Sequence, residues 1–176
     1  MKKLLVLVFS LVCFATNTFA QDCKHVDETT DAFTNKTTKS AKITIGKGGT
    51  KWLIEFNQSE GVTTMKWGIA MVGEYNQQFD KGTKLLLKLE NGTVLTLATT
   101  EASAPVTQAV NGGAYGVAIF STYYLKYDLS KESLTSLSGS PIADFKIDIP
   151  DQKIKNPNMT DKQTEKIKDV CTCLKG

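Results

Sequence analysis

Apolar and polar residues alternate with a period of two along much of the chain. From Asp144 to Ile149, for example, charged and apolar residues follow each other one by one. Side chains of a β-strand point alternately to its two faces, so this period is typical of strands with one buried face. The alternation predicts strands over residues 43–45, 52–56, 65–71, 117–127 and 145–149.

The stretch 85–97 reads LLLKLENGTVLTL and predicts a β-hairpin. Asn-Gly at its centre favours a two-residue type I′ turn, because both residues accept positive φ angles. That turn pairs Leu89 with Val94 and Leu87 with Thr96. The following residues, 98–116, are rich in Ala, Thr and Gly and predict a long connection without a strand.

Two helices are expected in the second half of the chain. Ser130 is a suitable N-cap for a short helix that ends at Gly139. Thr160 and Gln163 have the spacing of a capping box, which opens a C-terminal helix extending to about residue 172. Together with the strands, these elements predict a mostly β fold: a single-domain antiparallel β-sandwich or small barrel with one or two short helices, including the C-terminal one.

The first residues have the features of a secretory signal peptide, residues 1–20. Two lysines precede an apolar run over 4–15, and cleavage is expected near Ala20. The run is too short to span a bilayer. Neither Cys13 nor Cys23 follows the small residue that lipid attachment requires. We therefore expect a secreted or periplasmic protein that does not span the membrane. Residues 21–41 form an N-terminal arm or edge strand, and residues 42–176 form the β-sandwich domain with its C-terminal helix.

Cleavage leaves Cys23, Cys171 and Cys173, at the two ends of the mature chain. In an oxidising compartment this arrangement predicts a disulfide that joins the termini. Cys171 continues an apolar helical stripe, which favours it as the partner of Cys23, and Cys173 is the alternative.

The composition narrows the function classes. All 21 basic residues are lysine, and removing the two lysines of the signal lowers the net charge from +3 to +1. A near-neutral chain without arginine is not typical of a nucleic-acid-binding protein. His25 is the single histidine and lies close to the predicted cleavage site, which argues against a histidine-based catalytic site. No cofactor motif is present.

One candidate binding site is the loop 73–82, GEYNQQFDKG. Tyr75, Gln77, Phe79 and Asp80 combine aromatic faces with hydrogen-bonding groups, which is what recognition of a sugar requires. The alternative is an ordinary polar loop that tucks one aromatic ring under the sheet.

A second candidate is a tyrosine-rich strand. Tyr123 and Tyr127 share one face of it and Tyr124 takes the other. Core packing of these rings competes with a role in binding.

Acidic residues near the end of the last strand do not converge on a metal or catalytic site. Asp144 and Asp148 share a strand face but lie about 13 Å apart. That spacing is too long for direct ligation of one ion and also argues against a glycosidase pair, so we interpret Asp144, Asp148 and Asp151 as part of a solvated face. We predict no metal, cofactor or catalytic residue.

The function expected from the sequence is binding or interaction outside the cytoplasm, with a glycan or an envelope component as the partner. The alternative is a structural or assembly protein of the cell envelope that works through an edge strand. A carboxylate-based hydrolase is a further hypothesis, because that chemistry requires neither histidine nor arginine.

Overall fold

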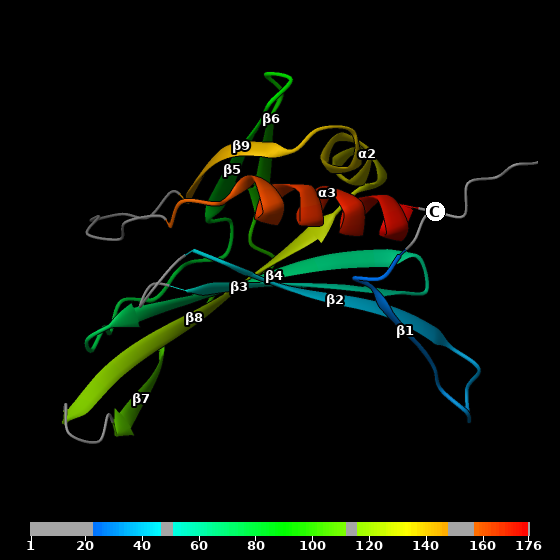
Figure 1. Ribbon diagram of the computed structural model, residues 1–176. Coiled ribbons are helices and arrows are strands. Elements are labelled where there is room, and N and C mark those ends of the chain that lie inside the picture. Colours follow the sequence, from blue (N-terminus) through cyan, green and yellow to red (C-terminus); the bar gives the residue numbers. More distant parts are fainter. Residues whose placement is uncertain (1–22, 47–50, 112–115, 148–156, 176) are drawn as a thin grey trace, which may run out of the picture.

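The computed structural model describes residues 23–46, 51–111, 116–147 and 157–175. Within them the strands form two antiparallel sheets (Figure 1). The larger sheet contains, in spatial order, β1 (Asp27–Thr30), β2 (Thr37–Ile45), β3 (Trp52–Ser59), β4 (Val62–Val72), β8 (Val117–Leu129) and β7 (Val106–Asn111). The smaller sheet contains β6 (Val94–Ala98), β5 (Lys84–Leu89) and β9 (Ile142–Ile147).

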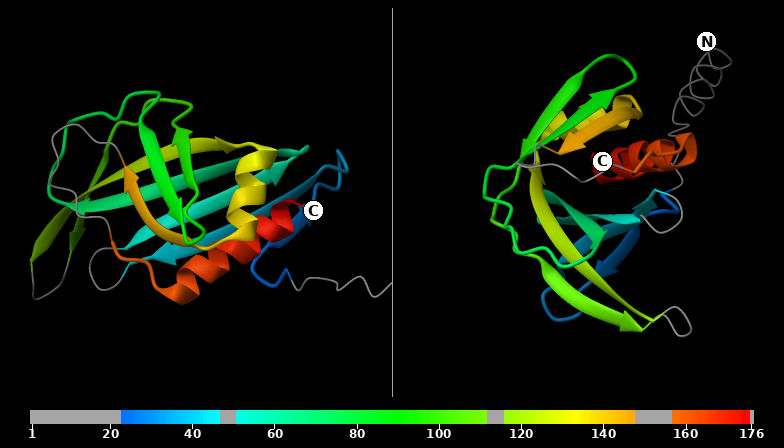
Figure 2. Two further views of the ribbon diagram at one scale, coloured as in Figure 1. Left: turned by 90° about the horizontal axis from the view of Figure 1, so that it is seen from above. Right: turned by 90° about the vertical axis from the view of Figure 1, so that its left-hand side faces the viewer.

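Two helices complete the fold, α2 (Lys131–Gly139) and α3 (Asp161–Lys175). The helices and the smaller sheet lie on one side of the larger sheet, which curves into a half-barrel (Figure 2). The expected fold class is therefore confirmed: the chain is a small, mostly β, single-domain protein with antiparallel sheets and a C-terminal helix.

The core lies between the two sheets and the helices. Alternate residues of β2, β3, β4 and β8 point into it, as the period-two pattern predicts. Three aromatic rings pack edge to face in the core: Trp52, Trp67 and Phe145. The ring centroids of Trp67 and Phe145 are 4.8 Å apart. Because Trp52 and Trp67 come from β3 and β4 and Phe145 from β9, this cluster joins the larger sheet to the smaller one.

The hairpin between β5 and β6 differs from the prediction by one residue in register. Leu87 pairs with Leu95 and Lys88 with Val94. Of the two residues expected in a type I′ turn, Gly92 has a positive φ (87°) and Asn91 does not. The connection is a three-residue loop in which Gly92 N–H donates to Leu89 O, and this arrangement places glycine in the left-handed region after a type I turn.

The connection expected over residues 98–116 contains a strand, β7. All six of its residues are exposed, so no alternation of buried and exposed positions marks it in the sequence.

Both helices begin where the sequence predicts. Ser130 Oγ accepts a hydrogen bond from Ser133 N–H (3.1 Å), and Gln163 Oε1 accepts one from Thr160 N–H (2.9 Å). The C-terminal helix extends to Lys175, three residues beyond the predicted end. Gln163 Nε2 also donates to Thr44 O of β2, which fixes the start of α3 on the larger sheet.

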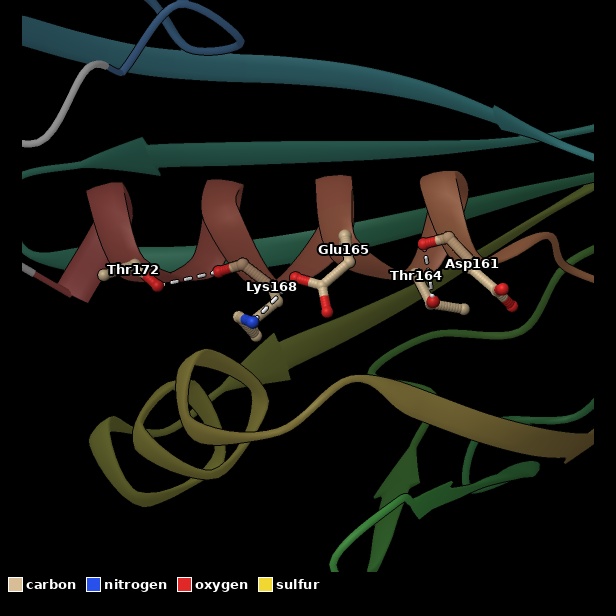
Figure 3. Close-up of polar contacts among 5 residues, drawn as sticks. All are labelled: Asp161, Thr164, Glu165, Lys168 and Thr172. Carbon is tan, nitrogen blue, oxygen red and sulfur yellow. Dashed lines mark hydrogen bonds and ion pairs between the residues drawn. The ribbon is translucent and has the colours of Figure 1, made fainter.

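Most polar contacts along the side of α3 stay within the helix (Figure 3). Lys168 forms an ion pair with Glu165, and the hydroxyls of Thr164 and Thr172 donate to main-chain carbonyls of the preceding turn. These contacts support the helix locally beside its apolar face, which packs in the core, and Thr164 is itself buried.

Cys23 forms the disulfide with Cys173, so the preference for Cys171 was wrong. Cys171 faces the core, is completely buried and is a free thiol. The helical stripe identified the more deeply buried cysteine correctly, but the bond forms with Cys173, two residues further along α3. The bond joins residues 150 positions apart.

Candidate functional site

The loop 73–82 is held against the larger sheet. Tyr75 N–H donates to Ser121 Oγ (3.0 Å), and Phe79 exchanges main-chain hydrogen bonds with Ser103 (2.9 and 2.8 Å). The Phe79 ring is buried and packs edge to face on Tyr123, with 4.6 Å between the ring centroids. This ring therefore belongs to the core, which agrees with the alternative interpretation of the loop as an ordinary polar loop with one aromatic ring tucked under the sheet.

The two tyrosines assigned to the site from the strand are also buried. Tyr123 donates its hydroxyl to Gln77 O (2.7 Å), and burial, with a smaller effect of nearby Tyr75, raises its pKa. Tyr127 is completely buried, and its hydroxyl has no hydrogen-bond partner among the described residues. The structure thus brings Tyr75, Gln77 and Phe79 to Tyr123 and places Tyr127 four residues further along β8, about 13 Å away.

Three side chains of the predicted site remain exposed: Tyr75, Gln77 and Asp80. The main-chain oxygen of Asp80 accepts hydrogen bonds from Thr83 Oγ1 (2.7 Å) and Thr99 Oγ1 (3.0 Å), which fixes the end of the loop. A role of these side chains in binding stays a prediction, but the loop offers one half-exposed ring rather than a broad aromatic platform.

A row of four charged side chains crosses the outer face of the larger sheet, the face that points away from the core. Lys42, Glu55, Lys66 and Lys126 lie on β2, β3, β4 and β8 and are register partners in turn. Glu55 forms ion pairs with Lys66 and with Lys42 (3.2 Å). Chiefly through the Lys66 hydrogen bond, these ammonium groups hold the pKa of Glu55 below its usual value.

The row contains an unbalanced pair of like charges. Lys66 and Lys126 stand directly opposite each other on β4 and β8, an arrangement that is unfavourable in an antiparallel sheet. Glu55 balances Lys66, whereas Lys126 has no ion-pair partner in the described part of the chain. Main-chain and hydroxyl hydrogen bonds from Thr100 to Lys126 O hold the strand in place. Lys126 is therefore the lysine of this row that can pair with an added negative charge.

An exposed aromatic ring adjoins the row. Tyr124 is 45% exposed on the outer face, directly opposite Gly68 in the register. A Cβ at Gly68 would lie 3.4 Å from the Tyr124 ring, so the absence of a side chain there lets the ring lie close to the sheet. Lys66 Nζ is 5.2 Å from the ring centroid, within the range of a cation–π contact.

The outer-face hollow is the depression around this row. Its volume is about 680 Å³, and polar or charged side chains dominate its lining: Ser40, Lys42, Glu55, Asn57, Thr64, Lys66, Glu101 and Lys126. Amide and hydroxyl groups can both donate and accept hydrogen bonds, and the lysines attract anions. Its three lysines stand against two carboxylates, Glu55 and Glu101, so the hollow combines hydrogen-bonding groups with one net positive charge.

Sequence reasoning did not identify the outer-face hollow. Lys66 and Lys126 each occupy polar positions of predicted strands, which is the usual place of a solvated lysine. Their meeting depends on the pairing of β4 with β8, whose residues are about 60 positions apart, and no local pattern in the chain specifies that pairing. Tyr124 was correctly placed on the face opposite Tyr123 and Tyr127, and this is the exposed tyrosine of the three.

Among the described residues, no group of three or more potential metal ligands lies together. Asp144 is exposed, and its carboxylate accepts a hydrogen bond from Phe145 N–H (2.8 Å). Asp148 and Asp151 lie outside the described residues.

Known proteins do not identify the chain: no family model, no curated protein and no solved structure matches it. In the part of the chain that the structure describes, none of the helices has the length and apolar character needed to cross a membrane.

Proposed function

We propose that the protein is an exported binding module for an acidic saccharide, and that the outer-face hollow is its binding site. The observation that carries this proposal is the pair of opposed lysines, Lys66 and Lys126, beside the half-exposed Tyr124. An acidic group of the ligand beside Lys126 would offset the repulsion between the two opposed lysines.

The chemistry around the two lysines favours a sugar over a simple anion. Tyr124 supplies an apolar ring on which the face of a pyranose can stack. Asn57 and Thr64 lie on neighbouring strands of the same hollow and offer an amide and a hydroxyl for the hydrogen bonds of sugar hydroxyls. Lysine rather than arginine in every basic position favours separate point contacts with acid groups over bidentate recognition of phosphate.

Export is the second part of the proposal. It is supported by the signal-peptide pattern of residues 1–20 and by the disulfide between Cys23 and Cys173, a bond typical of oxidising compartments. Mass spectrometry of the protein recovered from its natural host tests it: the expected mature chain begins at Gln21.

Binding can be tested with two polymers that share one backbone. Polygalacturonate carries carboxylates, and its methyl-esterified form does not, so calorimetric titration of the purified mature protein with each separates charge from sugar recognition. We expect binding of the acidic polymer and a large loss with the ester. Binding of neither polymer, or equal binding of both, would contradict the proposal.

Variants then locate the site. Lys126→Gln and Tyr124→Ala are expected to weaken binding, whereas Lys84→Gln on β5 is the matched control, since it also removes one exposed lysine. Tyr75→Ala tests the loop predicted from the sequence. If Tyr75→Ala removes binding and Lys126→Gln does not, the sugar site is that loop and not the outer-face hollow. Measuring release of reducing sugar in the same mixtures tests the hydrolase hypothesis.

A further inference from the structure

Strand β7 is an unusually open edge of the larger sheet. It pairs with β8 on one side, and none of the described strands pairs with its other side. All six of its residues are exposed. Figure 1 shows β7 and the adjoining end of β8 extending away from the helices and the smaller sheet, so neither layer covers this edge.

Sheet edges are normally protected against pairing with another chain by charged residues, short length or a covering element. The opposite edge, β1, is only four residues long and begins with Asp27 and Glu28. In the smaller sheet, β9 contains Asp144 and Lys146, and β6 contacts β8. Among the described residues, β7 has neither a charged side chain nor a covering element, and Pro105 directly before it is the one feature typical of a protected edge.

The sequence around β7 lacks charge over a long range. No residue from Ala102 to Leu125 is charged, although charged residues make up 22% of the chain. Aliphatic side chains of this region are exposed, including Val106 (48%) and Val110 (49%) on β7. Charged residues at an open edge would keep the protein soluble and discourage pairing with another strand. The uncharged, partly aliphatic composition of β7 favours such pairing.

The strand is complementary to itself. When two copies of Val106–Val110, VTQAV, run antiparallel about Gln108, each Val106 faces a Val110, each Thr107 faces an Ala109, and the two Gln108 residues face each other. Aliphatic pairs on one face and small residues on the other are favourable cross-strand neighbours, and no like charges meet. We infer that β7 binds the β7 strand of a second copy of this chain, antiparallel and centred on Gln108, to form a two-fold dimer with one continuous sheet.

The adjoining strand extends this complementarity. Phe120 is the register partner of Gln108, and Val72 is the partner of Phe120. These three residues lie on the outer face, so the paired strands align Val72, Phe120 and Gln108 of one copy with the same residues of the other. The contact strip of five residues is about 17 Å long, which corresponds to a small interface and therefore to a weak, concentration-dependent dimer.

Paired charge substitutions test both the association and its register. In Val106→Lys/Val110→Lys every valine pair becomes a lysine pair, and we expect the dissociation constant of the dimer to rise about tenfold or more. In Val106→Lys/Val110→Glu the same positions change, but each lysine now faces a glutamate, so the dimer should persist. A third variant, Val106→Glu/Val110→Glu, carries the opposite charges. Mixing it with the double-lysine variant should restore association, because each lysine then faces a glutamate.

Sedimentation velocity over a wide range of concentrations measures these constants. Since both valines are half exposed, circular dichroism should show the same fold for every variant, and Thr29→Lys on β1 serves as a control for a charge at another edge. A wild-type protein that stays monomeric throughout overturns the inference. So does association that the double-lysine variant leaves unchanged, or that both double variants weaken equally, because a different surface or register would then be in use.

Discussion

Replacing Cys23 and Cys173 together with serine removes the bond that ties the N-terminal segment to α3. The two cysteines are 150 positions apart, and closing a loop of that length stabilises a folded chain by about 5 kcal/mol in the chain-entropy model. Small domains are commonly stable by about 5–15 kcal/mol, so this bond accounts for a large part of the total. The double variant is expected to lose about 5 kcal/mol in its free energy of unfolding.

Urea unfolding followed by tryptophan fluorescence measures this loss, since Trp52 and Trp67 are both buried in the core. Cys171→Ala is the matched control, because it removes a buried thiol but leaves the disulfide. Its free energy of unfolding should fall by about 1 kcal/mol, the cost of the small cavity. In the native wild-type protein Cys171 should resist a thiol reagent, because burial raises its pKa to about 12. Equal losses in the two variants, or a wild-type peptide map that links Cys23 to Cys171, would refute the assignment.

Two further predictions concern single polar groups. Tyr127→Phe removes a buried hydroxyl that has no hydrogen-bond partner in the described residues, so it should raise the free energy of unfolding by about 1 kcal/mol. Tyr123→Phe removes the hydrogen bond to Gln77 O, so it should lower the free energy of unfolding by about 1 kcal/mol. Urea unfolding of the two variants tests both signs. The pKa of Glu55 is lower in the folded protein than its usual value of 4.5. The ionised Glu55 therefore stabilises the fold at pH values above 4.5, and this contribution is lost as the pH falls through the folded-state pKa. Lys66→Gln should move that pKa back up in an NMR titration, and an unchanged titration would show that the ion pair does not form in solution.

Local patterns were sufficient for most elements of the fold. The alternation from Asp144 onward identified β9, because one face of that strand packs on the core. Ser130 identified the start of α2, because its hydroxyl satisfies a main-chain N–H that the first turn leaves unpaired. In both cases the signal and its cause lie within a few residues of each other.

Features that depend on distant pairing could not be predicted in the same way. Strand β7 pairs with β8 and all six of its residues are exposed, so burial imposes no pattern on its side chains. The register of the β5–β6 hairpin was wrong because Asn-Gly fits a two-residue turn as well as a three-residue loop with Gly92 at its left-handed position. The candidate site on the outer face depends on β4 meeting β8, a contact that forms only in the complete sheet.

The two proposed surfaces lie on one sheet, and their geometry links them. Pairing about a two-fold axis through Gln108 keeps the outer faces of both copies on the same side, so the two outer-face hollows would face a ligand together. Strand rise and spacing place Lys126 of one copy about 40 Å from Lys126 of the other. A long acidic polymer can span that distance and a disaccharide cannot, so dimer formation should strengthen binding of the polymer alone. The two lysines of the Val106→Lys/Val110→Lys variant add positive charge to the outer face, so the measured quantity is the ratio of the polygalacturonate affinity to the digalacturonate affinity. This ratio should be lower in the variant than in the wild type. Equal loss for both ligands would mean that the substitutions disturb the hollow itself, and no loss for either would mean that the two surfaces work independently.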